Sequence, residues 1–151
     1  MAIKIEKTYR VDAPVERLWA FLTNPESVVS CIPGASLDEM VDERSFRGRV
    51  SVKVGPVEAR YEGDARFEEL DVDNYRMRLV AQGKGLGSAR LEMTSQLRPL
   101  DDGGTEATVI AVVNLTGRLV QLGSRMIKVV SDQLFEQFVK RVQDGVRADD
   151  G

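Results

Sequence analysis

The stretch GRLVQLGSRMIKVVSDQLFEQFVKRVQDGV, residues 117–146, decides the fold because a helical repeat begins there after a long run of strand patterns. Apolar residues recur in it every three or four positions, as on a helix with one broad apolar face. A helix from Arg118 to Val146 would be about 43 Å long at about 1.5 Å per residue. Such a helix can cross an entire sheet. The apolar positions are Leu119, Leu122, Met126, Ile127, Val130, Leu134, Phe135, Phe138, Val139 and Val142.

The chain before this helix alternates between polar and apolar residues, the pattern of half-buried strands. The alternating segments are FRGRVSVKV (46–54), VEARYEGDARFEEL (57–70), YRMRLVAQ (75–82) and ARLEMTSQL (89–97). Turn residues separate them. In TEATVIAVVNL (105–115) the central VIAVV is apolar on both faces, which predicts that a further layer covers this strand.

The N-terminal part predicts one more strand and two short helices. IKIEKTYRV (3–11) alternates, and DAPVERLWAFLTNP (12–25) has helical spacing that stops at Asn24 and Pro25. PESVVS (25–30) adds another helical turn or two. The order predicts an α+β helix-grip fold, with a curved antiparallel sheet of about seven strands wrapped around the long C-terminal helix. Gly48 and Gly63 would mark bulges or bends in that sheet.

One helix does not fill a strongly curved sheet completely, so we expect an apolar cavity between them. The length of 151 residues fits a single domain, which we place at 1–147, with a disordered tail at 148–151. The sequence has neither a long apolar run nor a signal peptide, and its net charge is −3. We therefore expect a cytoplasmic protein that does not bind nucleic acid.

The absence of histidine removes the usual catalytic triads and most zinc sites. Cys31 has no basic sequence neighbour and is interpreted as a packed thiol. GKGLGS (83–88) is interpreted as a hairpin turn, because a strand rather than a helix follows it. The turn residues Asp71, Asp73, Asp101 and Asp102 do not have the spacing of a calcium loop. We expect no metal, no catalytic residue and no enzymatic activity.

Three segments carry a family resemblance: APVERLWAFLTNPESVVSCIPGAS (13–36), GRVSVKVGPVEARYEGDARFEELD (48–71) and GRLVQLGSRMI (117–127). They resemble the carbon monoxide dehydrogenase CoxG family of the START-like, or SRPBCC, superfamily, over nearly the whole chain. The resemblance implies a helix-grip fold with a deep hydrophobic cavity. It also implies an accessory role beside a molybdenum hydroxylase of the carbon monoxide dehydrogenase type, in assembly, membrane recruitment or quinone delivery. Many relatives continue into an apolar C-terminal tail, whereas this sequence stops at RADDG (147–151).

Residues on apolar faces are the candidate cavity lining, and the tip of Trp19 and Tyr61 are its best polar groups. SCIPGAS (30–36) puts two apolar residues ahead of a Pro-Gly turn, so it is interpreted either as a lid over the cavity mouth or as a loop that caps the core. The predicted lining is Trp19, Leu22, Ile32, Pro33, Val50, Val52, Tyr61, Leu79, Met93, Ala111, Met126 and Val130.

The sequence favours a carrier of a lipophilic small molecule with no cofactor other than a bound quinone or lipid. Its expected partners are the hydrophobic ligand, components of a carbon monoxide dehydrogenase-like oxidoreductase, and peripherally the inner face of the membrane. One alternative is a START-like cyclase or hydrolyase that uses a cavity carboxylate; Glu58, Glu62, Asp64 and Glu92 all fall on the polar face, which argues against it. Another alternative is an assembly factor that binds no ligand.

Overall fold

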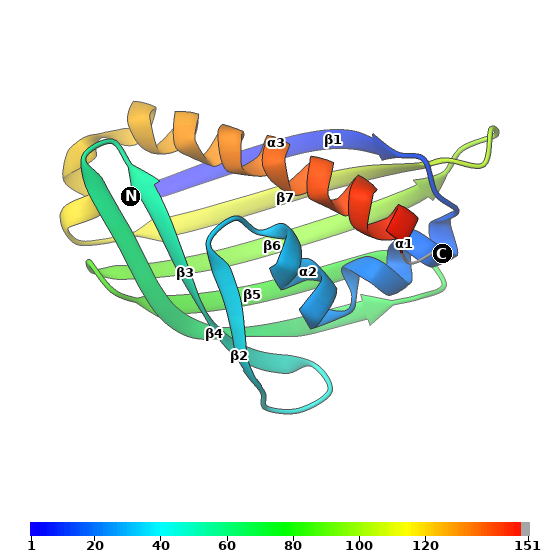
Figure 1. The fold of residues 1–151 in the computed structure, drawn as a ribbon, viewed down its shortest axis with the longest axis horizontal. Coiled ribbons are helices and arrows are strands. Elements are labelled where there is room, and N and C mark those ends of the chain that lie inside the picture. The colour runs from blue at the N-terminus through cyan, green and yellow to red at the C-terminus, as the bar shows by residue number, and fades with distance from the viewer. Residues whose placement is uncertain (149–151) are drawn as a thin grey trace.

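The computed structural model describes residues 1–148 and confirms the predicted helix-grip arrangement (Figure 1). A curved antiparallel sheet packs one face against the long helix α3 and the two short helices. The strands are β1 (Ala2–Val11), β2 (Ala35–Met40), β3 (Ser45–Val54), β4 (Val57–Asp71), β5 (Arg76–Lys84), β6 (Ser88–Pro99) and β7 (Thr105–Leu115). The helices are α1 (Val15–Leu22), α2 (Pro25–Cys31), the short 3-10 helix η1 (Arg118–Leu122) and α3 (Ser124–Ala148).

The sheet has seven strands in the order β1-β7-β6-β5-β4-β3-β2 over the described residues. Consecutive strands from β2 to β7 are hairpin neighbours, and the N-terminal strand β1 pairs with β7 at the far edge. The inward-facing residues therefore form continuous rows across the strands. The expected tail at 148–151 lies outside the described residues, apart from Ala148.

A row of glycines bends the sheet. Gly48 pairs with Gly63 and Gly63 pairs with Gly83, so three neighbouring strands lack a side chain at the same level. A Cβ on Gly63 would lie 1.9 Å from the Gln82 carbonyl oxygen, so the backbone approach excludes any other residue. The register shifts of the sheet lie elsewhere, between Leu37 and Glu39 and between Phe67 and Glu69. The glycines are thus bends and not bulges.

The C-terminal helix is shorter than its apolar pattern predicts. Gly123 has a φ of 89°, outside the helical region, and it separates η1 from α3. The interrupted helix also turns its buried stripe, which runs through Ile127, Ser131 and Val142. Met126 is 39% exposed as a result.

The apolar interior consists of two clusters. The larger one joins α1, α2 and the end of α3 to the sheet, through residues such as Leu18, Phe67 and Val142. The smaller one surrounds Leu119 and Ile127 near the start of α3. The middle of α3 spans the space between the two clusters.

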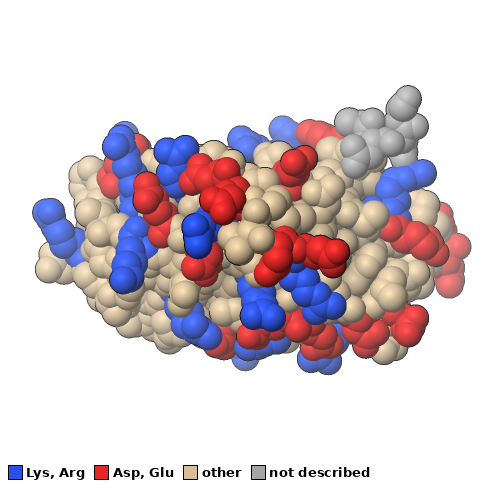
Figure 2. Space-filling model, turned by 90° about the horizontal axis from the view of Figure 1, so that it is seen from below, with Lys and Arg blue, Asp and Glu red and all other residues tan. Residues whose placement is uncertain are grey.

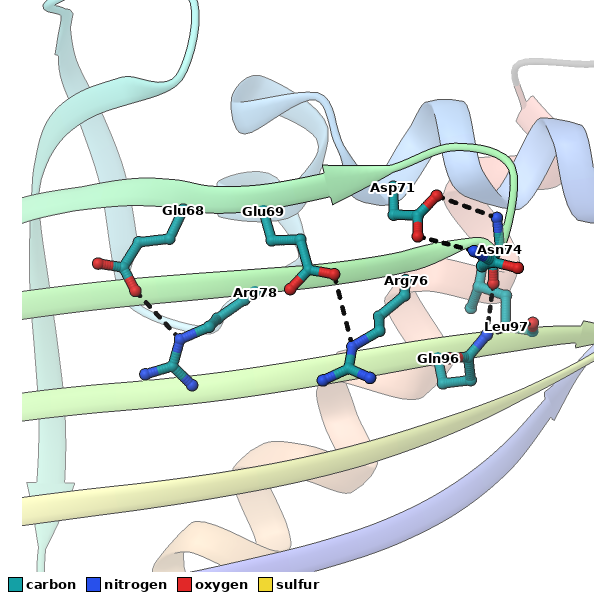
Figure 3. Close-up of polar contacts among 8 residues, drawn as sticks. All are labelled: Glu68, Glu69, Asp71, Asn74, Arg76, Arg78, Gln96 and Leu97. Atoms are coloured by element: carbon teal, nitrogen blue, oxygen red, sulfur yellow. Dashed lines mark hydrogen bonds and ion pairs between the residues drawn. The ribbon is translucent and has the colours of Figure 1, made fainter.

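The outer face of the sheet is polar and rich in ion pairs. Figure 2 shows Lys and Arg side chains interspersed with Asp and Glu on the side that it presents. Figure 3 shows two of these pairs, Glu68 with Arg78 at 3.0 Å and Glu69 with Arg76 at 3.6 Å. The predicted covering of VIAVV is wrong, because Ile110 points outward and is 44% exposed. The apolar character of that face of β7 is not explained by packing within the described residues.

Candidate functional site

An apolar cavity of about 290 Å³ lies between the sheet and the middle of α3. We call it the helix cavity. Its floor consists of two adjacent cross-strand rows, because Ile5, Ala111, Met93, Leu79 and Phe67 are successive register partners on β1, β7, β6, β5 and β4. The neighbouring row, two residues further along the strands, adds Val109, Ser95 and Met77.

Helices close the helix cavity from above. Ser131, Leu134, Phe135 and Phe138 of α3 line one side. Leu22 of α1, Val28 of α2, and Ile32 and Pro33, which follow α2 directly, line the other. No described residue of the lining is charged, so the helix cavity suits an uncharged apolar molecule.

Ser95 is the polar group that distinguishes the floor of the helix cavity. It is 3% exposed, and its Oγ has no hydrogen-bond partner among the described residues. Buried hydroxyl groups in proteins are nearly always paired, so an unpaired one in a cavity wall is poised to bind a polar atom of a ligand. The hydroxyl of Ser131 is different, because it donates to the Ile127 carbonyl oxygen at 2.8 Å.

Tyr9 lines the same cavity and packs edge-on against Phe135, with ring centroids 5.7 Å apart. Burial, together with the nearby Cys31 thiol, raises the pKa of the Tyr9 hydroxyl above its usual value. The hydroxyl therefore stays protonated at neutral pH and can donate a hydrogen bond. Tyr9 and Ser95 lie on the inner faces of β1 and β6.

An ion pair closes the edge of the fold beside the helix cavity. Lys7 lies in phase with the inward-facing residues of β1, and its Nζ is 3.1 Å from Oδ1 of Asp132 on α3. Both side chains are more than one-third exposed. The lysine charge thus stays at the edge and does not enter the helix cavity.

A second hollow, of about 230 Å³, continues along the same face of the sheet. We call it the glycine hollow. The described lining includes Val29 of α2 but nothing from α3. Its floor is formed by the next two cross-strand rows, one with Leu91, Ala81 and Ala65, and one with Gly83 and Gly63.

The polar groups of the glycine hollow are one tyrosine and a charged border. Burial raises the pKa of the Tyr61 hydroxyl, whose oxygen has no partner among the described residues. Arg49, Asp64 and Arg90 also border the hollow, but all three occupy exposed strand positions. Their charges can therefore stay in water while the floor of the hollow remains apolar.

The structure distributes the twelve predicted lining residues among three places. Those in the helix cavity are Leu22, Ile32, Pro33, Leu79, Met93 and Ala111. Those in the glycine hollow are Val50 and Tyr61. Trp19, Val52, Met126 and Val130 lie outside both.

Each of these four residues has a physical reason for its place. Trp19 packs edge-on against Tyr75 at a ring distance of 5.8 Å. Val52 and Val130 pack against the smaller apolar cluster, where side chains fill the space. Met126 lies against the hairpin at Gly55, because the break at Gly123 rotates the helix. The correction is that apolar position on a strand or helix does not separate cavity wall from packed core.

Sequence reasoning misses several lining residues. Ser95 and Ser131 interrupt apolar faces, so a hydrophobic pattern passes over them, although both keep the phase of their neighbours. Tyr9, Phe135 and Phe138 lie on predicted apolar faces, but the pattern does not assign them to the cavity. A polar residue in phase with an apolar strand face is the signal that could have identified Ser95.

The acidic residues lie away from the helix cavity. Glu58 accepts hydrogen bonds from Ser51 and Arg60, which lower its pKa, and Glu92 pairs with Arg78 and Arg90 on the outer face. Among residues 1–148 no three acidic or cysteine side chains come together in a way that could hold a metal ion.

Cys31 is buried at the end of α2, and burial is the main cause that raises the pKa of its thiol. A thiol that resists ionisation is a poor nucleophile, so the chemistry of this residue agrees with a packing role.

The family model for the carbon monoxide dehydrogenase protein CoxG matches residues 8–146. The chain belongs to the CoxG family. No curated protein matches it. No helix of this CoxG family member, within residues 1–148, has the length and apolar character needed to cross a membrane.

Solved structures show the same fold at low sequence identity. A conserved protein from Geobacillus kaustophilus is 22% identical, with a TM-score of 0.88 over 97% of this chain and 96% of that one. The ZhuI aromatase/cyclase from Streptomyces sp. R1128 is 12% identical, with a TM-score of 0.71 over 97% and 94%. A START superfamily protein from Mycobacterium smegmatis is 17% identical, with a TM-score of 0.65 over 96% and 97%. These likenesses confirm the START-like fold of the CoxG family member.

Proposed function

We propose that this protein binds and carries a lipophilic, quinone- or lipid-like small molecule in the helix cavity and catalyses no reaction itself. The observation that carries the proposal is the uncharged apolar lining of the helix cavity, with one buried, unpaired hydroxyl on Ser95. Burial of apolar ligand surface would supply the binding energy, at roughly 25 cal/mol per Å². A few polar groups would orient the ligand.

The chemistry of the helix cavity lining supports the non-enzymatic part of this proposal. None of the described lining residues is an acid or base that titrates near neutral pH. The four carboxylates Glu58, Glu62, Asp64 and Glu92 belong to exposed or outward-facing strand positions. A START-like fold also occurs in the ZhuI aromatase/cyclase, but that likeness is one of fold.

Membership of the CoxG family supports an accessory role beside a molybdenum hydroxylase of the carbon monoxide dehydrogenase type. In this role the protein would deliver its ligand to the oxidoreductase, or take part in its assembly or recruitment to the membrane surface. Purification from the native host, followed by identification of co-purifying proteins and of the solvent-extracted ligand, tests the role. Recovery of the pure protein with neither would contradict it.

Filling the helix cavity tests ligand binding. Ala111→Phe adds a ring to the cavity floor, whereas Ile110→Phe adds one on the outer face of the same strand. With the uncharged fluorescent probe N-phenyl-1-naphthylamine, we expect Ala111→Phe to lower affinity at least tenfold and Ile110→Phe to leave it unchanged. Thermal unfolding would show that both variants are folded, and Met93→Trp provides a second filling variant. Equal probe affinity in the parent and both filling variants would refute the proposed site.

A further inference from the structure

The helix cavity and the glycine hollow are adjacent parts of one surface. Their floors occupy consecutive cross-strand rows of the sheet, and Leu91 of β6 lines both. On β6 the inward-facing residues run from Ser95 through Met93 and Leu91 to Ala89. At about 3.3 Å per residue, Ser95 and Ala89 stand about 20 Å apart.

The two parts differ in what covers them. Four residues of α3 line the helix cavity, and none of the described lining of the glycine hollow comes from α3. Small residues on neighbouring strands keep the floor of the glycine hollow low: Ala65, Ala81, Gly63 and Gly83. The result is a shallow channel with an apolar floor that leads away from the enclosed helix cavity.

The polar end of the surface is well defined. Ser95 is buried and unpaired, Tyr9 is protonated at neutral pH, and no described lining residue brings a charge into the helix cavity. A hydroxyl pair without a cation favours a neutral oxygen over a carboxylate, because a buried carboxylate would lack compensation.

We infer that the two hollows hold one elongated, uncharged lipid, with its oxygen-bearing head at Ser95 and Tyr9 and its apolar tail across Leu91 in the glycine hollow. This inference rests on the proposed function and adds the ligand class, its direction and a tail subsite. It makes the glycine row serve the ligand as well as the bend of the sheet. Chain length and head charge then determine which lipids bind.

The experiment measures displacement of N-phenyl-1-naphthylamine by octanol, hexadecanol and palmitate, which differ in length and in head charge. We expect hexadecanol to bind the parent protein at least tenfold more tightly than octanol, and palmitate to bind more weakly than hexadecanol. Ser95→Ala should weaken both alcohols by a similar factor, because it removes the head contact that they share.

Ala81→Leu fills the glycine hollow, and Val80→Leu is its matched control on the outer face of the same strand. We expect Ala81→Leu to lower hexadecanol affinity at least tenfold and to leave octanol affinity unchanged, whereas Val80→Leu changes neither. Ala89→Leu offers a second filling variant, and thermal unfolding shows whether each is folded.

The outcomes separate this inference from the proposed function. If octanol and the probe bind but hexadecanol gains nothing, or if folded Ala81→Leu and Ala89→Leu bind hexadecanol normally, the tail subsite is refuted. Tighter binding of palmitate than of hexadecanol would refute the neutral head. If neither the probe nor any of the three lipids binds the parent protein, the proposed function itself fails.

Discussion

The two halves of α3 meet the same sheet in different ways. Towards its C-terminal end, Val142 and Val146 are 0% and 1% exposed, and Gly145 lets the Phe21 ring approach so closely that a Cβ would lie 2.6 Å from its Cζ. In the middle of the helix, Leu134 and Phe138 border the helix cavity instead. A single helix on a curved sheet is therefore well packed only where another element fills the remaining space.

The short helices supply that filling. Leu18 and Phe21 of α1 join Val142 and Val146 in one buried cluster, whereas Leu22 is the residue of α1 that lines the helix cavity. Stability and binding are thus separated along α3, with the packed end supporting the fold and the middle left free to take a ligand.

Truncation of a leucine at each place would test the separation most strongly. Leu18→Ala opens a void in the packed cluster and should lower the free energy of unfolding by about 2–5 kcal/mol. Leu134→Ala, which enlarges an existing cavity, should cost about 1 kcal/mol, since fewer contacts are lost. Urea unfolding measures both, and equal losses would contradict the comparison.

Buried hydroxyl groups offer a subtler pair. The Thr105 hydroxyl, at the packed end, donates to the Ala13 carbonyl oxygen at 2.8 Å, whereas the Ser95 hydroxyl has no partner among the described residues. Thr105→Val should therefore destabilise by about 1–3 kcal/mol, because it leaves a buried carbonyl unpaired. Ser95→Ala should leave stability unchanged or raise it by up to about 1 kcal/mol. A marked loss of stability in Ser95→Ala would mean that its hydroxyl is already satisfied.

The segment after α2 is where we expect the smallest change in stability and a large change in ligand exchange. Ile32 and Pro33 line the helix cavity, and Gly34, with a φ of 80°, turns the chain into β2. If this segment is a lid, Ile32→Asp should raise the ligand dissociation rate at least tenfold and lower stability by only about 1 kcal/mol. Ser30→Asp, on an exposed position of α2, should change neither.

Stopped-flow release of the naphthylamine probe and thermal unfolding would measure the two quantities on the same variants. Unchanged release beside a large loss of stability in Ile32→Asp would favour the other interpretation of the segment, in which Ile32 only caps the core.

Local sequence patterns are sufficient to predict the elements and their order. The period of two in segments such as 57–70 and the change to a helical period after Gly117 predict the strands and the final helix, because each period is set by backbone geometry within a few residues. The Asn24 and Pro25 pair likewise predicts a boundary between two helices, and the Asn24 side chain accepts a hydrogen bond from the Glu26 amide at 3.0 Å.

The position of the empty space was decided only by the tertiary structure. Val52 and Ala111 look alike in sequence, as inward-facing residues of alternating strands, yet one lies in a packed cluster and the other in the cavity floor. The difference arises from where α1, α2 and the rotated α3 cross the sheet, and no local pattern records it. Sequence thus determined which faces are apolar, whereas the packing of distant elements decided which apolar surface is left for a ligand.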